Sequence, residues 1–143
     1  MQPTYFIFIY GSLRSGFSQP AYNYISKYFN LVAKEAKVKG ILYNMGDYPV
    51  AKSTQENKFL KGELYCIKNN DEFSFAIAQL DGYEGVRMED NELPLFVRTT
   101  TTVYFNNESV EAWVYWYNGN VTGRPIIECG DVIQFFIEQQ KGS

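Results

Sequence analysis

Residues 4–10 form an unbroken run of aromatic and β-branched side chains near the start of the chain. Apolar groups occupy both faces of the strand alternation in this run, which predicts a central strand buried on both sides. The run breaks at Gly11, where the lack of a side chain permits a tight turn or a close backbone approach. We therefore expect the strand to end deep in the fold and to open into a loop at Ser12.

Alternating polar and apolar positions predict further strands over residues 32–43, with one wetter face, and over residues 61–68. Residues 95–105 and 109–117 are also typical of strands, because they are rich in threonine, valine and aromatic residues. The intervening Asn106 and Asn107 tolerate left-handed backbone conformations, so the last two strands are expected to form a hairpin.

Apolar residues at helical spacing predict three helices. The first is expected to follow Ser18 as its N-cap and to continue to Phe29, and the second to run from Glu72 to about Leu80. The third is expected over residues 131–139 at the end of the chain. Residues 46–49 have turn chemistry and residues 53–58 are polar, so both are expected to lie in loops.

The predicted strands outnumber the helices, and most connections resemble hairpins. This pattern favours an α+β fold built on a strongly curved sheet. The 143 residues are enough for one ordinary domain with a real core but not for two. We therefore expect a single domain over residues 1–143, without repeats or an interdomain linker.

Charge and composition narrow the choice of partner. The net charge is −3 and the 13 lysine and arginine residues are scattered, so nucleic acid is not an expected partner. The N-terminal apolar run is too short for a membrane span or a signal sequence, which favours a cytoplasmic protein without a membrane partner. Cys66 and Cys129 are accordingly expected to be reduced.

The chain contains no histidine. Serine or cysteine nucleophiles activated by histidine are thereby excluded, and so are nearly all catalytic zinc sites. Chemistry must use carboxylates, hydroxyl groups, lysines or backbone amides, and we expect neither a metal nor a cofactor. The loop after Tyr10 is one candidate, because successive amides after Gly11 can converge on an oxygen-rich ligand; a plain exit from the strand is the alternative.

Several sequence blocks, in a fixed order, resemble the γ-glutamylcyclotransferase-like family, and in particular its γ-glutamylamine cyclotransferase and avirulence-induced branch. These blocks are FIYGSLR at residues 8–14, GILY at 40–43, GDYP at 46–49, GELY at 62–65 and LDGYEG at 80–85. The resemblance extends from about residue 5 to residue 131, and the ordered set is far more specific than any one block. It implies a small mixed β-barrel flanked by two or three helices, with the pocket at one end of the barrel.

The resemblance also implies a reaction. Family members cyclise a γ-glutamyl group: its α-amine attacks its own γ-carbonyl, forming 5-oxoproline and releasing an amine or amino acid. The substrate supplies its own nucleophile, so neither histidine nor a metal is needed, and holding the two groups in position provides much of the acceleration. The protein must supply a base, because an α-amine is mostly protonated at neutral pH.

By match to the family's blocks, Glu84 is that general acid and base. The loop residues that are expected to bind the γ-glutamyl group are Tyr10, Gly11, Ser12 and Leu13. Tyr115 is expected to line the pocket, with a packed strand tyrosine as the alternative. Arg14 is a candidate for attracting an anionic substrate.

Two features leave alternatives open. Phe96 stands where the family commonly has tyrosine, so a hydroxyl that could bind substrate is missing and the substrate can differ from that of the family. This difference also favours a second hypothesis, a non-catalytic module that binds a small ligand or a partner. Asp81 could pair with Glu84 as in a two-carboxylate hydrolase, or it could end the helix or orient its neighbour. The leaving group and the oligomeric state are not encoded in any recognised block.

Overall fold

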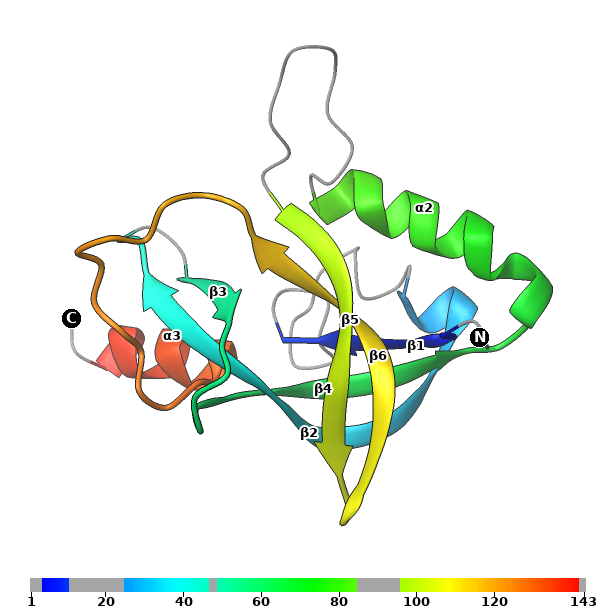
Figure 1. Cartoon of the computed structure of the whole chain (residues 1–143), viewed down its shortest axis with the longest axis horizontal. Helices are drawn as coiled ribbons and strands as arrows, with labels where there is room; N and C mark the ends of the chain where they lie inside the picture. The colour runs from blue at the N-terminus through cyan, green and yellow to red at the C-terminus, as the bar shows by residue number, and fades with distance from the viewer. Residues whose placement is uncertain (1–3, 11–24, 47–48, 85–95, 142–143) are drawn as a thin grey trace.

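A computed structural model describes residues 4–10, 25–46, 49–84 and 96–141 (Figure 1). The elements in chain order are β1 (Phe6–Ile9), β2 (Phe29–Asn44), β3 (Pro49–Ser53), β4 (Phe59–Ile67), the short 3-10 turn η1 (Asn70–Glu72), α2 (Phe73–Glu84), β5 (Phe96–Phe105), β6 (Glu108–Tyr117) and α3 (Val132–Lys141). Residues 25–28 are also helical and lead directly into β2. In this view α2 lies along the upper right of the barrel and α3 lies at its left end.

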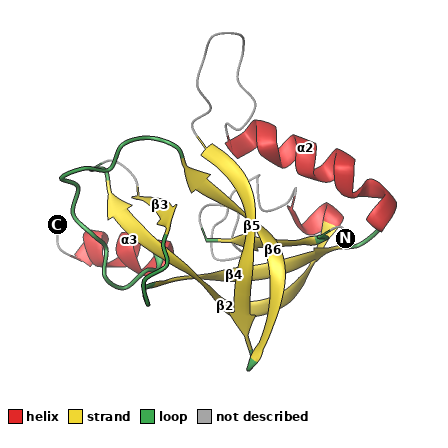
Figure 2. Cartoon of the chain, in the orientation of Figure 1, coloured by secondary structure: helices red, strands yellow, loops and turns green. Residues whose placement is uncertain are grey.

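The strands form a closed mixed barrel. Their order is β3-β2-β4-β1-β6-β5, and β2 pairs with β5 through Lys37↔Tyr104 and Val38↔Val103, which closes the sheet on itself. The β1–β6 pair is parallel and the other pairs are antiparallel. The helices lie outside the barrel and β3 extends it beyond β2 (Figure 2). The prediction of an α+β fold with a small mixed barrel flanked by helices is confirmed.

Strand β1 is the centre of the barrel wall, as the apolar run predicted. It lies between β4 and β6, and the exposed fractions of Ile7, Phe8 and Ile9 are only 0%, 1% and 3%. Phe8 points into the barrel core, whereas Ile7 and Ile9 belong to a second apolar cluster that packs with α2. Each such side chain stabilises the fold by about 1.5–3 kcal/mol through burial, so the end of β1 is firmly fixed.

The β5–β6 hairpin follows its predicted turn. Asn106 and Asn107 have φ angles of 48° and 63°, the left-handed values that a two-residue hairpin turn requires. The register then continues without a break from Phe105↔Glu108 to Phe96↔Tyr117. The turn thus determines which residues of β5 and β6 face each other at the far end of the hairpin.

Strand β2 departs from strict alternation. Its register with β4 shifts between Leu31 and Ala33 and again between Ala33 and Ala36. Ala33, Ala36 and Val38 therefore all reach the barrel core, although uniform alternation placed Ala33 on the opposite face. The cause is the bulging itself, which inserts residues and bends a long strand enough to close a barrel.

Two predictions about the elements were wrong. Phe29 begins β2 instead of ending the first helix, and β3 lies between the predicted turn at residues 46–49 and the predicted loop at residues 53–58, where no strand was predicted. Within the described residues β3 pairs with β2 alone, and a short edge strand tolerates Pro49 at its first position. The α3 helix is present close to the predicted range.

Helix α2 begins as predicted and ends later. The Asn69 side chain caps η1 by accepting a hydrogen bond from the amide of Asp71, and Ala76, Ile77 and Leu80 are buried beneath the helix. The helix then continues through Gly82 to Glu84, although it was expected to end at about Leu80. None of the helices in the described parts of the chain is long and apolar enough to cross a membrane.

Candidate functional site

A buried ion pair joins the last turn of α2 to the barrel. The Asp81 residue is only 7% exposed, and both of its carboxylate oxygens accept hydrogen bonds from Arg98 on β5. The Arg98 Nε to Asp81 Oδ1 distance is 2.7 Å and the Nη2 to Oδ2 distance is 2.9 Å. This two-point geometry is the strongest form of a pair between arginine and a carboxylate.

Two tyrosines extend the pair to the end of β1. The Tyr115 hydroxyl donates to Asp81 Oδ1 at 2.8 Å, and the Tyr10 hydroxyl donates a short hydrogen bond to the backbone carbonyl of Tyr115. Tyr10 directly follows β1, Tyr115 lies on β6 and Asp81 lies on α2. The network therefore links β1, β6, β5 and α2, and we call Tyr10, Asp81, Arg98 and Tyr115 the Asp81 network.

An aromatic ring supports the guanidinium. The Arg98 Cζ atom lies 4.4 Å from the centre of the Trp113 ring, and the Trp113 indole donates to the Thr4 carbonyl at 3.1 Å. Burial by itself lowers the pKa of Arg98, but the hydrogen bonds and charge of Asp81, with a contribution from Tyr115, outweigh burial and raise this pKa above its ordinary value. The guanidinium is therefore a permanent cation.

The structure brings some of the predicted site residues together. Tyr10 and Tyr115 are in contact, and Glu84 is the last residue of α2, one turn beyond Asp81. Because the helix was expected to end at about Leu80, Glu84 was expected to follow it; Glu84 is instead the final helical residue. Gly11, Ser12 and Leu13 lie outside the described residues, as does Arg14.

Two other sequence hypotheses can be compared with the structure. Phe96 is the first residue of β5, and its ring meets the Tyr117 ring edge-on with centroids 5.8 Å apart. Asp81 does not end the helix, and its oxygens bind Arg98 and Tyr115. Since a carboxylate held in this way is committed to its cation, Asp81 is suited to orienting the helix rather than to activating water.

Arg98 is the residue that the sequence hypotheses missed. A signal for it existed, because counting back along both strands from the turn at Asn106 and Asn107 places Arg98 opposite Tyr115. The partner on α2 gave no such signal, since its position depends on how the helix packs. Among the described residues there is no group of three or more aspartate, glutamate or cysteine side chains that could hold a metal ion.

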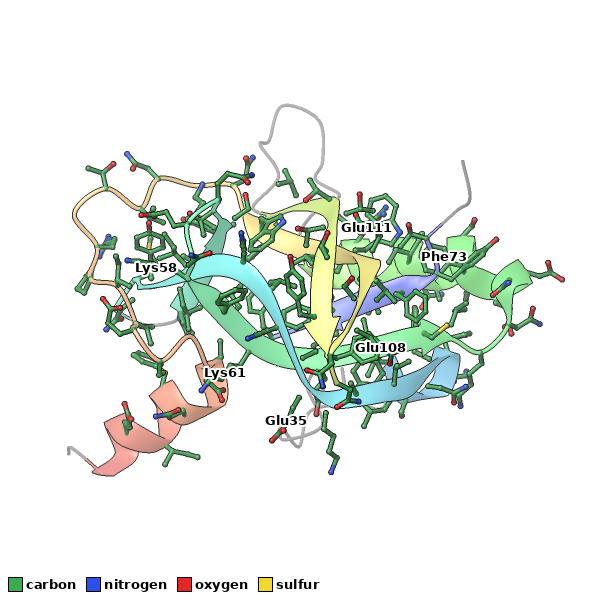
Figure 3. The ribbon with its side chains drawn as sticks, turned by 60° about the horizontal axis from the view of Figure 1, so that its bottom comes forward. Glu35, Lys58, Lys61, Phe73, Glu108 and Glu111 are labelled. Carbon is green, nitrogen blue, oxygen red and sulfur yellow. The ribbon has the colours of Figure 1, made fainter. Side chains whose placement is uncertain are left out.

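A second buried carboxylate lies on β4. Glu63 is 4% exposed, accepts a hydrogen bond from the Tyr65 hydroxyl at 2.9 Å, and pairs across the strands with Ile9 at the end of β1. It also lines an open groove of about 1370 Å³ beside the β5–β6 hairpin, together with Lys61, Glu35 and Glu108. Figure 3 shows these last three residues along the side of the barrel that faces the viewer. Three lysines and four acidic residues line this groove, so it has no dominant charge.

The protein is thus a small closed mixed β-barrel flanked by helices, in which a buried ion pair joins the last turn of α2 to β5. The chain belongs to the γ-glutamyl cyclotransferase, AIG2-like family, whose model matches residues 7–133.

A relative agrees with this membership, and solved structures share the fold. The chain is 30% identical over 128 residues to a Vibrio cholerae protein named "Putative gamma-glutamylcyclotransferase", covering 90% of this chain and 95% of that one. A mouse AIG2-like crystal structure has a TM-score of 0.59 at 18% identity, covering 89% of this chain and 88% of the other. YkqA from Bacillus subtilis has a TM-score of 0.70 at 18% identity over 97% of this chain, which spans only 43% of YkqA.

Proposed function

We propose that the protein is a γ-glutamyl cyclotransferase that releases 5-oxoproline from a γ-glutamyl amine or γ-glutamyl amino acid. Family membership over residues 7–133 and the Vibrio cholerae relative support the general activity. The observation that carries the assignment to a site is the Asp81 network, which joins the helix turn ending at Glu84 to Tyr115 and Tyr10.

The proposed reaction needs one base and a substrate held in a folded shape. The α-amine nitrogen forms a bond to the γ-carbonyl carbon, and the bond from that carbon to the leaving nitrogen breaks. Counted from the substrate ammonium, two protons leave the attacking nitrogen and two reach the leaving nitrogen, which departs as an ammonium ion. Because both reacting groups belong to one molecule, their alignment replaces an enzyme nucleophile, and effective molarities of about 10⁵–10⁸ M are known for such well-oriented reactions.

Glu84 is the proposed proton carrier. As a carboxylate it removes one proton from the substrate ammonium, which frees the amine to attack, and it passes this proton to the leaving nitrogen as the C–N bond breaks. It then accepts the second proton, which the attacking nitrogen loses on ring closure, and passes it to the released amine. Its place at the end of α2 suits this task, because the unpaired carbonyl groups of a helix C-terminus and its negative dipole end favour a cation such as the substrate ammonium.

The loop that begins at Tyr10 is the proposed γ-glutamyl site, with Gly11, Ser12 and Leu13 supplying backbone amides for the substrate carboxylate or the developing oxyanion. Preorganised amides in a dry site stabilise such charge better than water does. Tyr115, on the neighbouring strand β6, is the proposed pocket residue. Its hydroxyl is engaged by Asp81, so we expect it to shape the pocket and not to transfer protons.

The test is release of 5-oxoproline from a panel of γ-glutamyl amines and γ-glutamyl amino acids by wild-type protein, Glu84→Gln and the control Glu72→Gln. Glu72 is an exposed glutamate in η1, before the other end of α2. We expect the wild type and the control to release 5-oxoproline with the same preferred leaving group, and Glu84→Gln to lose at least about 100-fold in kcat, within the range typical of a general base.

The same panel tests the alternative of a binding module. If ligands raise the melting temperature of the wild type but no 5-oxoproline forms, the protein binds without catalysis and the proposal is wrong. If Glu84→Gln turns over like the wild type, the reaction stands and the assigned base is wrong.

A further inference from the structure

The sequence of the last turn of α2 disfavours helical structure at this position. It carries Asp81 and the proposed base Glu84, both acidic, whereas the negative end of a helix dipole favours basic residues, and this turn has none. It also contains Gly82, which lowers helix stability in any position before the C-cap. The helix nevertheless continues through all three residues, so something outside the helix stabilises this turn.

The missing positive charge comes from the barrel. Arg98 contacts Asp81 with two hydrogen bonds of 2.7 Å and 2.9 Å, and its guanidinium lies over the Trp113 ring. Residues Arg98 and Trp113 lie on the hairpin strands β5 and β6, whose register is continuous. The cation is thereby fixed to a rigid part of the molecule.

We propose that Asp81 and Arg98 are positioning residues, which hold the last turn of α2 in helical form and so fix the direction in which it presents Glu84. Residues three apart in a helix lie on nearly the same face, about 60° apart around the axis. A restraint on Asp81 therefore limits the rotation and fraying of the turn that contains Glu84. The link to catalysis rests on the proposed role of Glu84, while the anchoring of the turn does not.

Three substitutions separate this role from general stability. Arg98→Lys keeps the charge and loses the two-point geometry, Arg98→Met removes both, and Thr99→Val is the matched control on the next residue of β5. Thr99 accepts a hydrogen bond from the Trp116 indole at 2.9 Å. All variants are compared under conditions in which circular dichroism shows them to be fully folded.

The first readout is amide hydrogen exchange, which does not depend on any activity. For Arg98→Met we expect exchange at residues 81–84 to become at least tenfold faster, with residues 76–78 in the middle of α2 unchanged. Thr99→Val is expected to leave both regions unchanged. Wild-type exchange at residues 81–84 in Arg98→Met would overturn the proposal.

The second readout is the split between kcat and KM for 5-oxoproline release. We expect kcat to fall about tenfold in Arg98→Lys and about 100-fold in Arg98→Met, the size of loss that a small misplacement of a catalytic group produces, with KM changed less than twofold. In a Glu84→Gln background the same substitutions should have little further effect on the residual rate. An undiminished effect in that background would show that Arg98 acts on the substrate directly, which also overturns the proposal.

The two readouts keep the two hypotheses apart. If the wild type forms no 5-oxoproline, the proposed function fails, and hydrogen exchange still decides whether Arg98 anchors the turn. If the wild type is active, and Arg98→Met keeps both the wild-type kcat and the wild-type protection of residues 81–84 from hydrogen exchange, the proposed anchoring role is wrong and the proposed function stands.

Discussion

Asp81 and Glu63 are both buried carboxylates that accept a hydrogen bond from a tyrosine hydroxyl, yet their settings differ. Glu63 lies in β4, which pairs with β1 at Glu63 itself and with β2 at the adjacent Gly62 and Leu64, so the strand is held regardless of this side chain. Asp81 lies in the last turn of a helix, and a guanidinium from another element binds it. The difference teaches that a buried ion pair can hold a segment of backbone in place. A central strand is already held by its pairing with neighbouring strands, whereas the last turn of a helix needs such an anchor.

The largest expected effect is at Asp81. Asp81→Asn keeps the size of the side chain but leaves Arg98 without its counter-charge, and breaking a buried pair from one side is strongly destabilising. We expect a loss of about 3 kcal/mol in the free energy of unfolding, at the lower end of the usual range because the Arg98 side chain is 21% exposed. Urea unfolding followed by circular dichroism measures this loss. A loss under about 1 kcal/mol would contradict the claim that Asp81 anchors the end of α2.

The packing of β4 against β1 can be disturbed by a substitution at Gly62, next to Glu63. A β-carbon on Gly62, the neighbour of Glu63, would lie 2.4 Å from the Ile9 carbonyl oxygen and 2.6 Å from the Phe8 ring. Gly62→Ala must therefore push β1 away, and we expect a loss of about 2–3 kcal/mol, in the range for overpacking, together with weaker substrate binding. Unchanged urea unfolding and unchanged KM would mean that β1 can shift freely.

Removing one hydroxyl at each carboxylate sharpens the comparison. Tyr115→Phe and Tyr65→Phe each delete a hydrogen bond to a carboxylate, and we expect each to lower stability by about 1–2 kcal/mol. Tyr115→Phe alone is expected to raise KM, because Tyr115 belongs to the proposed pocket. Equal changes in KM for both variants would contradict the assignment of Tyr115 to the substrate site.

The smallest expected effect concerns alkaline pH. The raised pKa of Arg98 keeps the ion pair intact, so the stability difference between wild type and Arg98→Met should stay constant from about pH 7 to pH 10.

Burial raises the pKa of the Cys66 thiol. The folded state therefore holds this proton more tightly than the unfolded state, and its contribution is lost as pH rises above about 8.5.

Urea titrations at several pH values measure this effect, with Cys66→Ala as the control. We expect a slight decline in wild-type stability above about pH 8.5 and a smaller decline in Cys66→Ala. If the free energies of unfolding of Arg98→Met and the wild type instead become equal before pH 10, the Arg98 guanidinium does not remain charged over this range.

The sequence predicted those parts of the fold that depend on local patterns. The two apolar faces of residues 4–10 identified β1 as central, and Asn106 and Asn107 identified the hairpin. The bulges of β2 were not predicted, because they satisfy barrel closure and not the local alternation. The end of α2 was misplaced for a similar reason: Gly82 is typical of a helix end, and the ion pair that overrides it comes from a distant strand.

The candidate site divides in the same way. Tyr10 and Tyr115 were identified through resemblance to the family, and the structure places them in contact. The pairing of Asp81 with Arg98 could not be read from the chain, because seventeen positions separate the two residues and they lie on elements of different type. Only the packing of α2 on the barrel brings them together.

The central claim is that Glu84 carries the proton in a cyclisation that forms 5-oxoproline. The most direct test is the initial rate of 5-oxoproline release by fully folded wild-type, Glu84→Gln and Glu72→Gln proteins on the γ-glutamyl compound that the panel identifies as the best substrate. We expect release by the wild type and by Glu72→Gln, and a loss of at least about 100-fold in Glu84→Gln. Equal rates in all three proteins would contradict the role of Glu84, and no release by the wild type would contradict the reaction itself.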